Sequence, residues 1–262
     1  MTVMTRVLPM LPFNGRRAPR VVERNLIVYR HTWLIIFSGF FEPLFYLLGL
    51  GFGLGALIGN VDGLPYQAFI APALLASSSM NGAIYDSTFN MFYKLKYAKT
   101  YDAMLSTPLG VGDVALGEVT WALMRGALYA VGFMVVMLLL GLMRSPWGLL
   151  AAPASLCIGY AAAGVGTAAT SFVRKWQDFD LVFVVTLPLF LFSATFLPIT
   201  AYPDALRVFV EITPLYRGVH LIRGLTTGAI EPMLLVDVAY LLIMGTIGLA
   251  ITSRRLGKLL LK

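Results

Sequence analysis

The 262-residue sequence has few of the side chains that build soluble catalytic sites: one cysteine, two histidines and a charged fraction of 13%. Cys157 alone permits neither an internal disulfide nor a cysteine-based metal cluster, and we interpret it as a small packing residue. No cluster of acids or metal ligands accompanies His31 or His220 in the sequence, so we expect no metal site. Hydrophobic residues make up 58% of the chain, against roughly 45–50% in soluble domains. The composition therefore indicates a protein embedded in a membrane.

The sequence also lacks the glycine-rich loop with which ATPases bind phosphates. No Gly-x-x-x-x-Gly-Lys-Ser/Thr motif occurs, and the pair Gly257-Lys258 has neither the upstream glycine nor the following hydroxyl. We therefore expect this chain to bind no ATP or Mg²⁺ and to be non-catalytic. The first thirty residues are polar and are interrupted by Pro12, Gly15 and Pro19, unlike a cleaved secretory signal.

Six long apolar runs dominate the rest of the sequence. Each reaches the roughly 20 residues that a helix needs to cross about 30 Å of hydrocarbon. The runs cover residues 32–58, 67–92, 114–142, 147–172, 179–200 and 233–252. No stretch outside them reaches the roughly 50 residues of a compact soluble domain. We predict an all-α membrane protein with one transmembrane domain over residues 1–262, comprising a tail and interfacial helix (1–31), six spans (32–253) and a second tail (254–262).

Lysine and arginine mark one side of these runs. Fifteen of the twenty lie in alternate gaps: Arg6, Arg16, Arg17, Arg20, Arg24, Arg30, Lys94, Lys96, Lys99, Arg174, Lys175, Arg254, Arg255, Lys258 and Lys262. By the positive-inside rule, both termini and the loops after the second and fourth runs face the cytoplasm. Anionic lipid headgroups and this orientation signal explain the net charge of +7, and we expect no nucleic-acid partner.

The segment before the first run carries a helical pattern. Pro19 suits a first helical turn, and the residues that follow mix apolar side chains with Glu23, Arg24 and Arg30 at a polar margin. We predict a short amphipathic helix that lies in the cytoplasmic headgroup plane. A disordered basic arm is the alternative.

The loop between the second and third runs contains another short helix. Thr100 can cap it, and Pro108 ends it. Tyr101, Met104 and Leu105, at positions i, i+3 and i+4, then form an exposed apolar face, which is typical of a docking surface. A loop helix that lies on lipid is the alternative interpretation.

Charged residues inside the apolar runs are candidate functional groups, because charge in hydrocarbon is costly. Among them we single out Glu42, Asp86, Glu118 and Arg125. Glu42 precedes Pro43, so capping or pairing within the subunit competes with a functional role. Glu118 and Arg125 lie seven residues apart, about two turns along one helix face. A buried functional ion pair with another span is one interpretation of this spacing, and a structural pair is the commoner outcome.

The first two runs also suggest close helix contacts. Gly49, Gly51, Gly53, Gly55 and Gly59 show small-xxx-small spacings that let helices approach closely, either within the subunit or between subunits. Aromatic and polar side chains on these runs are candidates for a substrate path at a dimer interface, with lipid-facing or core positions as the alternative. The candidates are Phe37, Phe40, Phe41, Tyr46, Asn81, Tyr85 and Phe89.

The segment from Tyr202 to Glu231 holds two apolar pieces that are too short to span, the second opened by Pro214. Two short helices that dip into the outer leaflet and return explain this pattern, because backbone at that depth stays hydrogen-bonded within helices. Arg217, His220 and Arg223 on this external hairpin are candidates to touch an anionic headgroup, with a plain surface role as the alternative.

Three stretches together carry a family resemblance. They are Glu23-Arg24-Asn25 to Tyr29-Arg30 leading into Trp33 and Glu42-Pro43, Tyr101 to Leu109 followed by Asp113 and Gly117-Glu118, and Thr213-Pro214-Leu215 to Leu221-Ile222-Arg223. They resemble the interfacial helix and first span, the cytoplasmic coupling loop and the external re-entrant hairpin of the membrane subunit of type 2 ABC exporters. The closest likeness is to the branch with lipooligosaccharide or nodulation-factor exporters and daunorubicin-type antibiotic exporters. The likeness begins near residue 20 and reaches the C-terminus, and Tyr216 to His220 departs from it by being more basic.

This resemblance implies a half-transporter of a bacterial cell membrane. It implies pairing with a second permease subunit, identical or related, and with two cytoplasmic ATPase subunits that carry the ATP and Mg²⁺. The substrate it implies is amphipathic: a drug or antibiotic, a glycolipid or a polysaccharide-type molecule. The positions it assigns to ATPase coupling are Tyr101, Asp102, Met104, Leu105, Thr107 and Pro108, and those it assigns to the interfacial helix are Glu23, Arg24 and Arg30.

Other functions stay open on the residues alone. A secondary transporter usually shows internal repeats with broken helices in matching halves, and no convincing repeat is visible in this sequence. A membrane-embedded lipid- or glycan-modifying enzyme needs a cluster of acids, histidines or metal ligands at one membrane face. A passive channel needs a charged or carbonyl-rich filter sequence.

Overall fold

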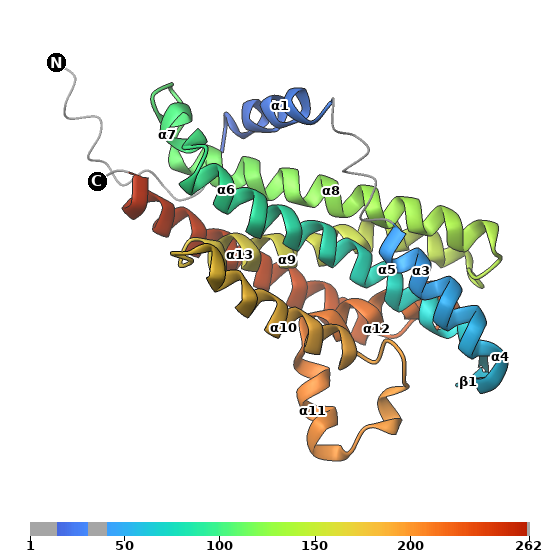
Figure 1. The fold of residues 1–262 in the computed structure, drawn as a ribbon. Coiled ribbons are helices and arrows are strands. Elements are labelled where there is room, and N and C mark those ends of the chain that lie inside the picture. The colour runs from blue at the N-terminus through green and yellow to red at the C-terminus, as the bar shows by residue number, and fades with distance from the viewer. Residues whose placement is uncertain (1–14, 31–40, 261–262) are drawn as a thin grey trace.

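The computed structural model describes residues 15–30 and 41–260, and Figure 1 shows them as an elongated bundle of helices. Within this part of the chain, four helices are long and apolar enough to cross a membrane: Phe41–Ile58, Val111–Leu139, Pro146–Thr170 and Met233–Leu259. Strand structure among the described residues is confined to β1 (Asn60–Val61), which pairs antiparallel with β2 (Leu64–Pro65). The prediction of an all-α membrane protein is confirmed.

The helical elements follow the predicted runs closely. In chain order they are α1 (Ala18–Tyr29), α3 (Phe41–Tyr46), η2 (Leu47–Leu54), α4 (Gly55–Ile58), α5 (Tyr66–Tyr85), η3 (Asp86–Asn90), α6 (Met91–Lys96), α7 (Thr100–Leu105), α8 (Val111–Leu139), η4 (Pro146–Leu150), α9 (Ala151–Thr170), η5 (Trp176–Phe179), α10 (Asp180–Leu191), η6 (Ile199–Ala201), α11 (Asp204–Ile212), α12 (Pro214–Thr227) and α13 (Met233–Leu260). The segments η2 and η3 are π-helical turns inside continuous helices, a feature that often marks functional sites.

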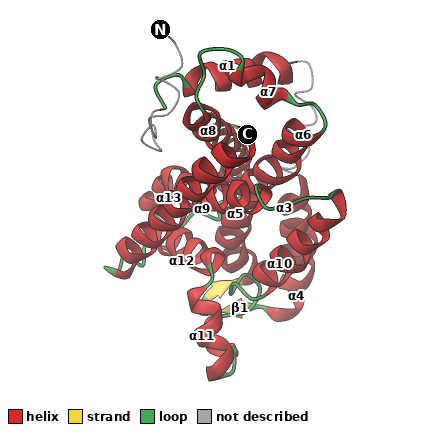
Figure 2. Cartoon of the chain, turned by 90° about the vertical axis from the view of Figure 1, so that its left-hand side faces the viewer, coloured by secondary structure: helices red, strands yellow, loops and turns green. Residues whose placement is uncertain are grey.

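Helix α5 lies at the centre of the bundle, packed against α8, α9 and α12 (Figure 2). Most of its residues are buried, including the run from Ser77 to Ser79. The Ser79 hydroxyl donates to the carbonyl of Ser155 on α9 at 2.7 Å, and the Ser77 hydroxyl donates to the carbonyl of Leu74 at 3.0 Å. Two of the three serines are thus hydrogen-bonded, one within α5 and one to α9, whereas the buried Ser78 hydroxyl has no partner among the described residues.

Helices α9 and α13 cross at backbone contact. A Cβ atom added to Gly164 on α9 would lie 2.4 Å from the carbonyl oxygen of Gly245 on α13. A Cβ atom added to Gly248 would lie 2.3 Å from the carbonyl carbon of Gly164. Only glycine fits at these positions, so the small residues of α9 make it the packing helix that the sequence suggests.

The glycines of the first predicted span divide between two faces. Added Cβ atoms on Gly51 and Gly55 would lie 3.1 to 3.3 Å from side chains that include Ile70 and Gln67 of α5. Added Cβ atoms on Gly49 and Gly53 meet nothing within 4 Å. Gly51 and Gly55 thus serve packing within the subunit, whereas the other face is open in the single chain. The start of this span, with the candidates Phe37 and Phe40, lies outside the described residues.

The fifth predicted span is shorter than the sequence indicates. The sequence predicts a helix to residue 200, but α10 ends at Leu191, and Ala194 has a φ of 54°. Pro188 has no backbone donor for the helix, and the Arg223 guanidinium donates to the carbonyl of Ala194 at 2.9 Å. Together η5 and α10 give about 26 Å of helix, slightly less than the roughly 30 Å of a hydrocarbon core.

The bundle has two distinct ends (Figure 1). Helices α1 and α7 and the end of α13 lie at one end, here named the α7 end, and α4, β1 and α11 lie at the other, the α11 end. The predicted pair of short helices after the fifth span is present as α11 and α12. Thr213 caps α12 by accepting the backbone N–H of Tyr216 at 3.4 Å. Helix α12 packs against α5, α9 and α13, whereas α11 projects from the bundle.

Candidate functional site

Helix α1 lies along the first turns of α8 at the α7 end (Figure 1). Its buried residues include Val21 and Asn25. A Cβ atom added to Gly117 of α8 would lie 2.5 Å from the Cβ of Val21, so the glycine provides the space for this side chain. The buried residues Ala18, Val21 and Asn25 share one face of α1, as an amphipathic helix requires, and the last turn of the helix also exposes three consecutive apolar side chains. These are Leu26, Ile27 and Val28.

The start of α1 is tied to the loop that precedes α8. The backbone N–H of Arg17 donates to Asp113 Oδ1 at 2.9 Å, and the backbone N–H of Gly110 donates to Asp113 Oδ2 at 2.9 Å. The Arg17 guanidinium also donates to the carbonyl of Pro108. One carboxylate therefore joins the beginning of the first helix to the segment that follows α7.

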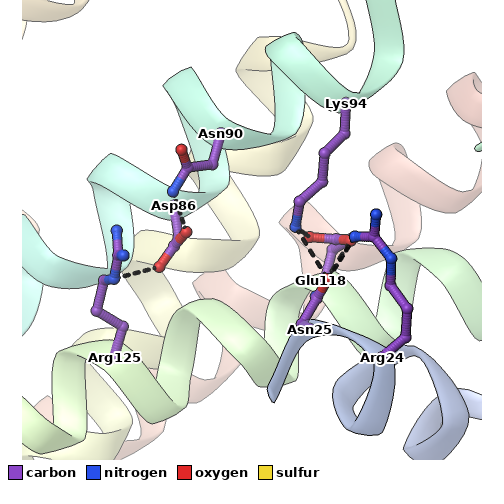
Figure 3. A network of polar contacts seen from close by, with 7 residues as sticks. All are labelled: Arg24, Asn25, Asp86, Asn90, Lys94, Glu118 and Arg125. Carbon is purple, nitrogen blue, oxygen red and sulfur yellow. Dashed lines mark hydrogen bonds and ion pairs between the residues drawn. The ribbon is translucent and has the colours of Figure 1, made fainter. Parts of the chain in front are cut away.

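A buried polar cluster connects α1, α6 and α8 (Figure 3). Lys94 Nζ on α6 lies 2.7 Å from Glu118 Oε2 on α8, and the two side chains are only 7% and 3% exposed. Asn25 of α1 donates to Glu118 Oε1 at 3.4 Å and accepts from Lys94 at 3.4 Å. Arg24, half-buried, donates to the Asn25 side-chain oxygen at 3.0 Å. Each of the three helices contributes one member of the Lys94–Glu118–Asn25 cluster.

A second buried ion pair lies beside the first (Figure 3). Arg125 Nε of α8 lies 2.8 Å from Asp86 Oδ2 of η3, with both side chains 2% exposed. The Asn90 amide donates to the other oxygen of Asp86. The Arg125 guanidinium also lies 5.5 Å from the ring centres of both Tyr29 and Tyr85. The expected pairing of Glu118 and Arg125 with another span is thus present in the structure.

These two clusters fix the relative positions of three helices. Each carboxylate is matched by a cation, and Arg24 adds a further positive charge at the edge of the network. Removing one member of a buried pair typically costs about 3–5 kcal/mol, because the other charge is left without compensation. These contacts tie α1, the helix of η3 and α6, and the start of α8 together at the α7 end.

Two tyrosines at this end are held in the protonated form. Burial raises the pKa of Tyr101 well above its ordinary value, and the nearby Glu118 charge raises it further. Burial, followed by the charge of Asp86, raises the pKa of Tyr29 to about 12. The Tyr29 ring also packs 5.3 Å from that of Trp121 on α8. Both phenols therefore stay neutral at physiological pH and add no charge to the clusters.

Helix α7 differs in one respect from its predicted form. It covers Thr100–Leu105 as expected, but Lys99, in a left-handed conformation with φ of 47°, occupies the capping position. The predicted exposed face is largely buried, because Tyr101 and Met104 pack into the core and Leu105 is half-buried. The exposed residues of this segment are Asp102, Ala103, Ser106, Thr107 and Pro108. An ATPase-docking role for the segment stays a prediction, and the structure moves the accessible surface to these residues.

A separate polar cluster lies toward the α11 end. Asp237 of α13 is fully buried, and its oxygens lie 3.1 Å from Arg217 Nη1 and 2.6 Å from His220 Nδ1 of α12. Arg223, farther along α12, donates to the carbonyls of Phe69 and Ala194, and its guanidinium lies 4.1 Å from the ring centre of Phe69. All three predicted hairpin residues therefore hold α12 to its neighbours, a role that differs from the plain surface role given as their alternative.

The candidates for a substrate path lie on neighbouring helices. Phe41 and Tyr85 are exposed, Asn81 is half-buried, and Tyr46 packs 5.5 Å from Phe190 of α10. Helices α3 and α10 flank the same side of α5 (Figures 1 and 2).

Phe89 instead belongs to an aromatic cluster that anchors the start of α10. Its ring centre lies 4.7 Å from that of Phe179 and 6.1 Å from that of Trp176. Glu42 is exposed in the single chain, and no ion pair or hydrogen bond of its side chain is seen among the described residues. The pairing within the subunit that competes with a functional role for Glu42 is therefore absent from the described part of the chain.

Sequence reasoning missed Asn25, Lys94 and Asp237 as members of these clusters. Lys94 was counted among the loop cations, but Asp86, Asn90 and Lys94 recur at every fourth residue. That spacing places polar groups on one face of a helix. The signal for Asp237 was a lone acid in an apolar run, which is itself a functional indicator.

Comparison with known proteins places this arrangement in a family. The chain matches the family model of the ABC-2 type transporter over residues 20–226. It is 33% identical over 221 residues to Nodulation protein J of Rhizobium leguminosarum bv. viciae, covering 83% of this chain and 85% of that protein. It is 32% identical over 222 residues to Nodulation protein J of Rhizobium meliloti (strain 1021), covering 84% of each chain. The chain belongs to the ABC-2 type transporter family and is the membrane permease subunit of an ABC exporter.

Proposed function

We propose that the chain is one half of an ATP-driven exporter of an amphipathic substrate, and that its α7 end is the cytoplasmic face on which separate ATPase subunits act. The observation that carries this proposal is the buried network of Lys94, Glu118 and Asn25. It joins the interfacial helix α1 to the helices on both sides of α7.

The proposed topology has six spans with both termini in the cytoplasm. Four of the spans are the helices that meet the length and hydropathy requirements. The other two are the continuous helix of α5, η3 and α6, and the helix of η5 with α10. The helices α11 and α12 form the external re-entrant hairpin. Helix α8 is about 43 Å long, so roughly two turns extend beyond about 30 Å of hydrocarbon. Those extra turns at the α7 end are the ones that carry α1 and Asp113.

The ATPase is expected to contact the exposed side of α7. Ala103, Ser106, Thr107 and Pro108 are exposed there, with Asp102 beside them. The buried Tyr101 and Met104 connect this surface to the core, because their side chains lie within it. The six residues predicted for coupling thus divide between direct contact (Asp102, Thr107, Pro108) and anchoring (Tyr101, Met104, Leu105).

Movement of α7 would then reach the spans through the two ion pairs. Lys94 and Asp86 lie on the helix that enters α7, whereas Glu118 and Arg125 lie on the helix that leaves it. Since each pair bridges the two helices, a push on α7 displaces both together. Asn25 carries α1, with Glu23, Arg24 and Arg30, along with them.

The substrate path is proposed between two permease subunits. Phe41, Tyr46 and Tyr85 are accessible on one side of the single chain, and Gly49 and Gly53 leave the same first helix open for close approach. The second subunit is identical or related. The relatives carry the name Nodulation protein J, and the proposed substrate is amphipathic: a drug or antibiotic, a glycolipid or a polysaccharide-type molecule. ATP and Mg²⁺ are expected on the ATPase subunits.

Charge introduced on α7 tests the proposal in the assembled complex. Thr107→Arg is expected to reduce co-purification of the ATPase and ATP-dependent transport in vesicles, because it places a bulky cation at the exposed surface. Asp204→Arg, at the start of α11 on the opposite end, is the matched control. Equal ATPase retention and transport in both variants would refute the docking assignment.

A further inference from the structure

A cleft of about 490 Å³ separates α10 from the bundle. Its walls come from α5, α9, α10 and α13, and nearly all of its lining residues are apolar. This volume lies within the roughly 300–1,000 Å³ of ligand-binding clefts. Helix α10 has no buried residue along its whole length. Protein packing alone therefore does not fill the space between this helix and its neighbours.

The cleft lies on a distinct face of α10. Val182, Val185 and Leu189, at i, i+3 and i+7, line it. Phe183 and Leu187 lie on the opposite face, and both are 60% exposed. A second permease subunit packed on that outer face would leave the cleft open. A protein partner on the outer face would therefore not fill the cleft.

No Lys or Arg lines the cleft itself, but three cations lie next to lining residues at the end of the cleft nearer the α7 end. Phe172 lines the cleft, and the Arg255 guanidinium of α13 lies 4.6 Å from its ring centre. The Nε of Arg255 is buried and has no hydrogen-bond partner among the described residues. Arg174 and Lys175 are exposed just before η5. Their backbone N–H groups donate to Asp178 Oδ2 at 2.9 and 3.0 Å, so the carboxylate in the lining is held by the same loop that carries these two cations.

We infer that the cleft binds an anionic phospholipid from the leaflet at the α7 end. One acyl chain fills the apolar cleft, and the phosphate lies at the mouth against Arg255, Arg174 and Lys175. Guanidinium groups bind phosphate through charge-assisted hydrogen bonds, and basic groups at a membrane surface attract anionic lipids. From Asp178 to Leu189 the cleft wall is about 16 Å long, a length that suits an extended acyl chain.

The bound lipid has a structural consequence. An unfilled gap forfeits the dispersion contacts of the atoms that line it. An acyl chain restores those contacts between α10 and α9 while leaving α10 free to shift against a fluid neighbour. The lipid is thus a resident ligand of the permease, distinct from the transported substrate.

The test uses the complex with its ATPase in nanodiscs of equal phosphatidylglycerol and phosphatidylcholine. Native mass spectrometry then counts the lipids retained by each permease chain. We expect one tightly held phosphatidylglycerol. Arg255→Gln is expected to lower its retention about tenfold or more, because a charge-assisted bond is lost. Arg254→Gln, which removes an exposed charge from the same turn, is expected to retain it.

A second pair of variants tests the acyl site. Val185→Trp fills the cleft and is expected to release the lipid, whereas Val184→Trp on the outer face is expected to keep it. Equal retention of the two lipids in the unmodified complex would overturn the inference, as would equal effects of Arg254→Gln and Arg255→Gln. Loss of transport in Val185→Trp with the phosphatidylglycerol still bound would identify the cleft as a substrate site and would also overturn it. If the Val185→Trp variant does not assemble with the ATPase, the comparison of Arg255→Gln with Arg254→Gln tests the inference by itself.

Discussion

Replacing Lys94 with methionine isolates the contribution of the buried network. The substitution keeps the length of the side chain and removes its charge, which leaves Glu118 buried and 3% exposed beside the amide of Asn25. Removing one partner of such a pair typically costs about 3–5 kcal/mol. We expect Lys94→Met to lower the free energy of unfolding by that amount.

A compensating substitution separates lost charge pairing from lost packing. Glu118→Gln removes the stranded charge, and its amide oxygen still accepts from Asn25. We expect the double variant Lys94→Met/Glu118→Gln to recover most of the loss, with a coupling energy of about 2–3 kcal/mol between the two sites. Arg20→Met provides the control, because Arg20 pairs with Glu23 on the surface with 75% and 57% of the side chains exposed. Exposed pairs contribute less than about 1 kcal/mol.

The assay is denaturant unfolding of the purified chain in lipid micelles, followed through the transition midpoint. A coupling energy below about 0.5 kcal/mol corresponds to independent sites. That result, or a Lys94→Met loss no larger than that of Arg20→Met, would refute the reasoning that this pair holds the α7 end together.

Three further predictions concern the attachment of other elements. Gly117→Ala is expected to lower the free energy of unfolding by about 1–3 kcal/mol through overpacking and to speed tryptic cleavage of α1. Gly257→Ala is the control, because its Cβ meets nothing within 4 Å, and it is expected to leave the cleavage rate unchanged. Asp237→Leu is expected to lower the unfolding free energy by about 3 kcal/mol, because it strands Arg217, which is 18% exposed; a change below that of a surface substitution would contradict this. The Asp178 carboxylate accepts the backbone N–H groups of residues 174 and 175 at the start of η5, so Asp178→Ala is expected to cost about 0.5–2 kcal/mol of unfolding free energy, as for a lost helix cap; a loss no larger than that of a surface substitution would contradict it.

The sequence predicted the class of fold because hydrocarbon imposes length and polarity on each span. Both boundaries of α8 and the start of α13 lie within a few residues of the predicted runs, whereas α13 continues past its predicted end to Leu260. The end of α10 was missed because a tertiary contact decides it: Arg223 binds the carbonyl of Ala194, some thirty residues earlier in the chain. No local pattern carries that information.

The site was predicted in part for a similar reason. Asp86, Glu118 and Arg125 were recognised because charge in an apolar run is conspicuous. Tyr101 and Met104 share one face of α7, as predicted, but that face is buried and not exposed. Helical periodicity shows which residues share a face and leaves open whether that face meets a partner or the core. Asn25 and Lys94 became members of the site only through the packing of α1 and α6 on α8.

The most direct test of the account is crosslinking from α7 to the ATPase in intact membranes. In a Cys157→Ala background, Ser106→Cys places a thiol on the exposed side of α7, and Asp204→Cys places one on α11. We predict that Ser106→Cys crosslinks to the ATPase subunit with a yield that changes on ATP addition, and that Asp204→Cys reacts instead with an impermeant reagent added outside the cell. Labelling of Ser106→Cys from outside, without any ATPase crosslink, would contradict the account.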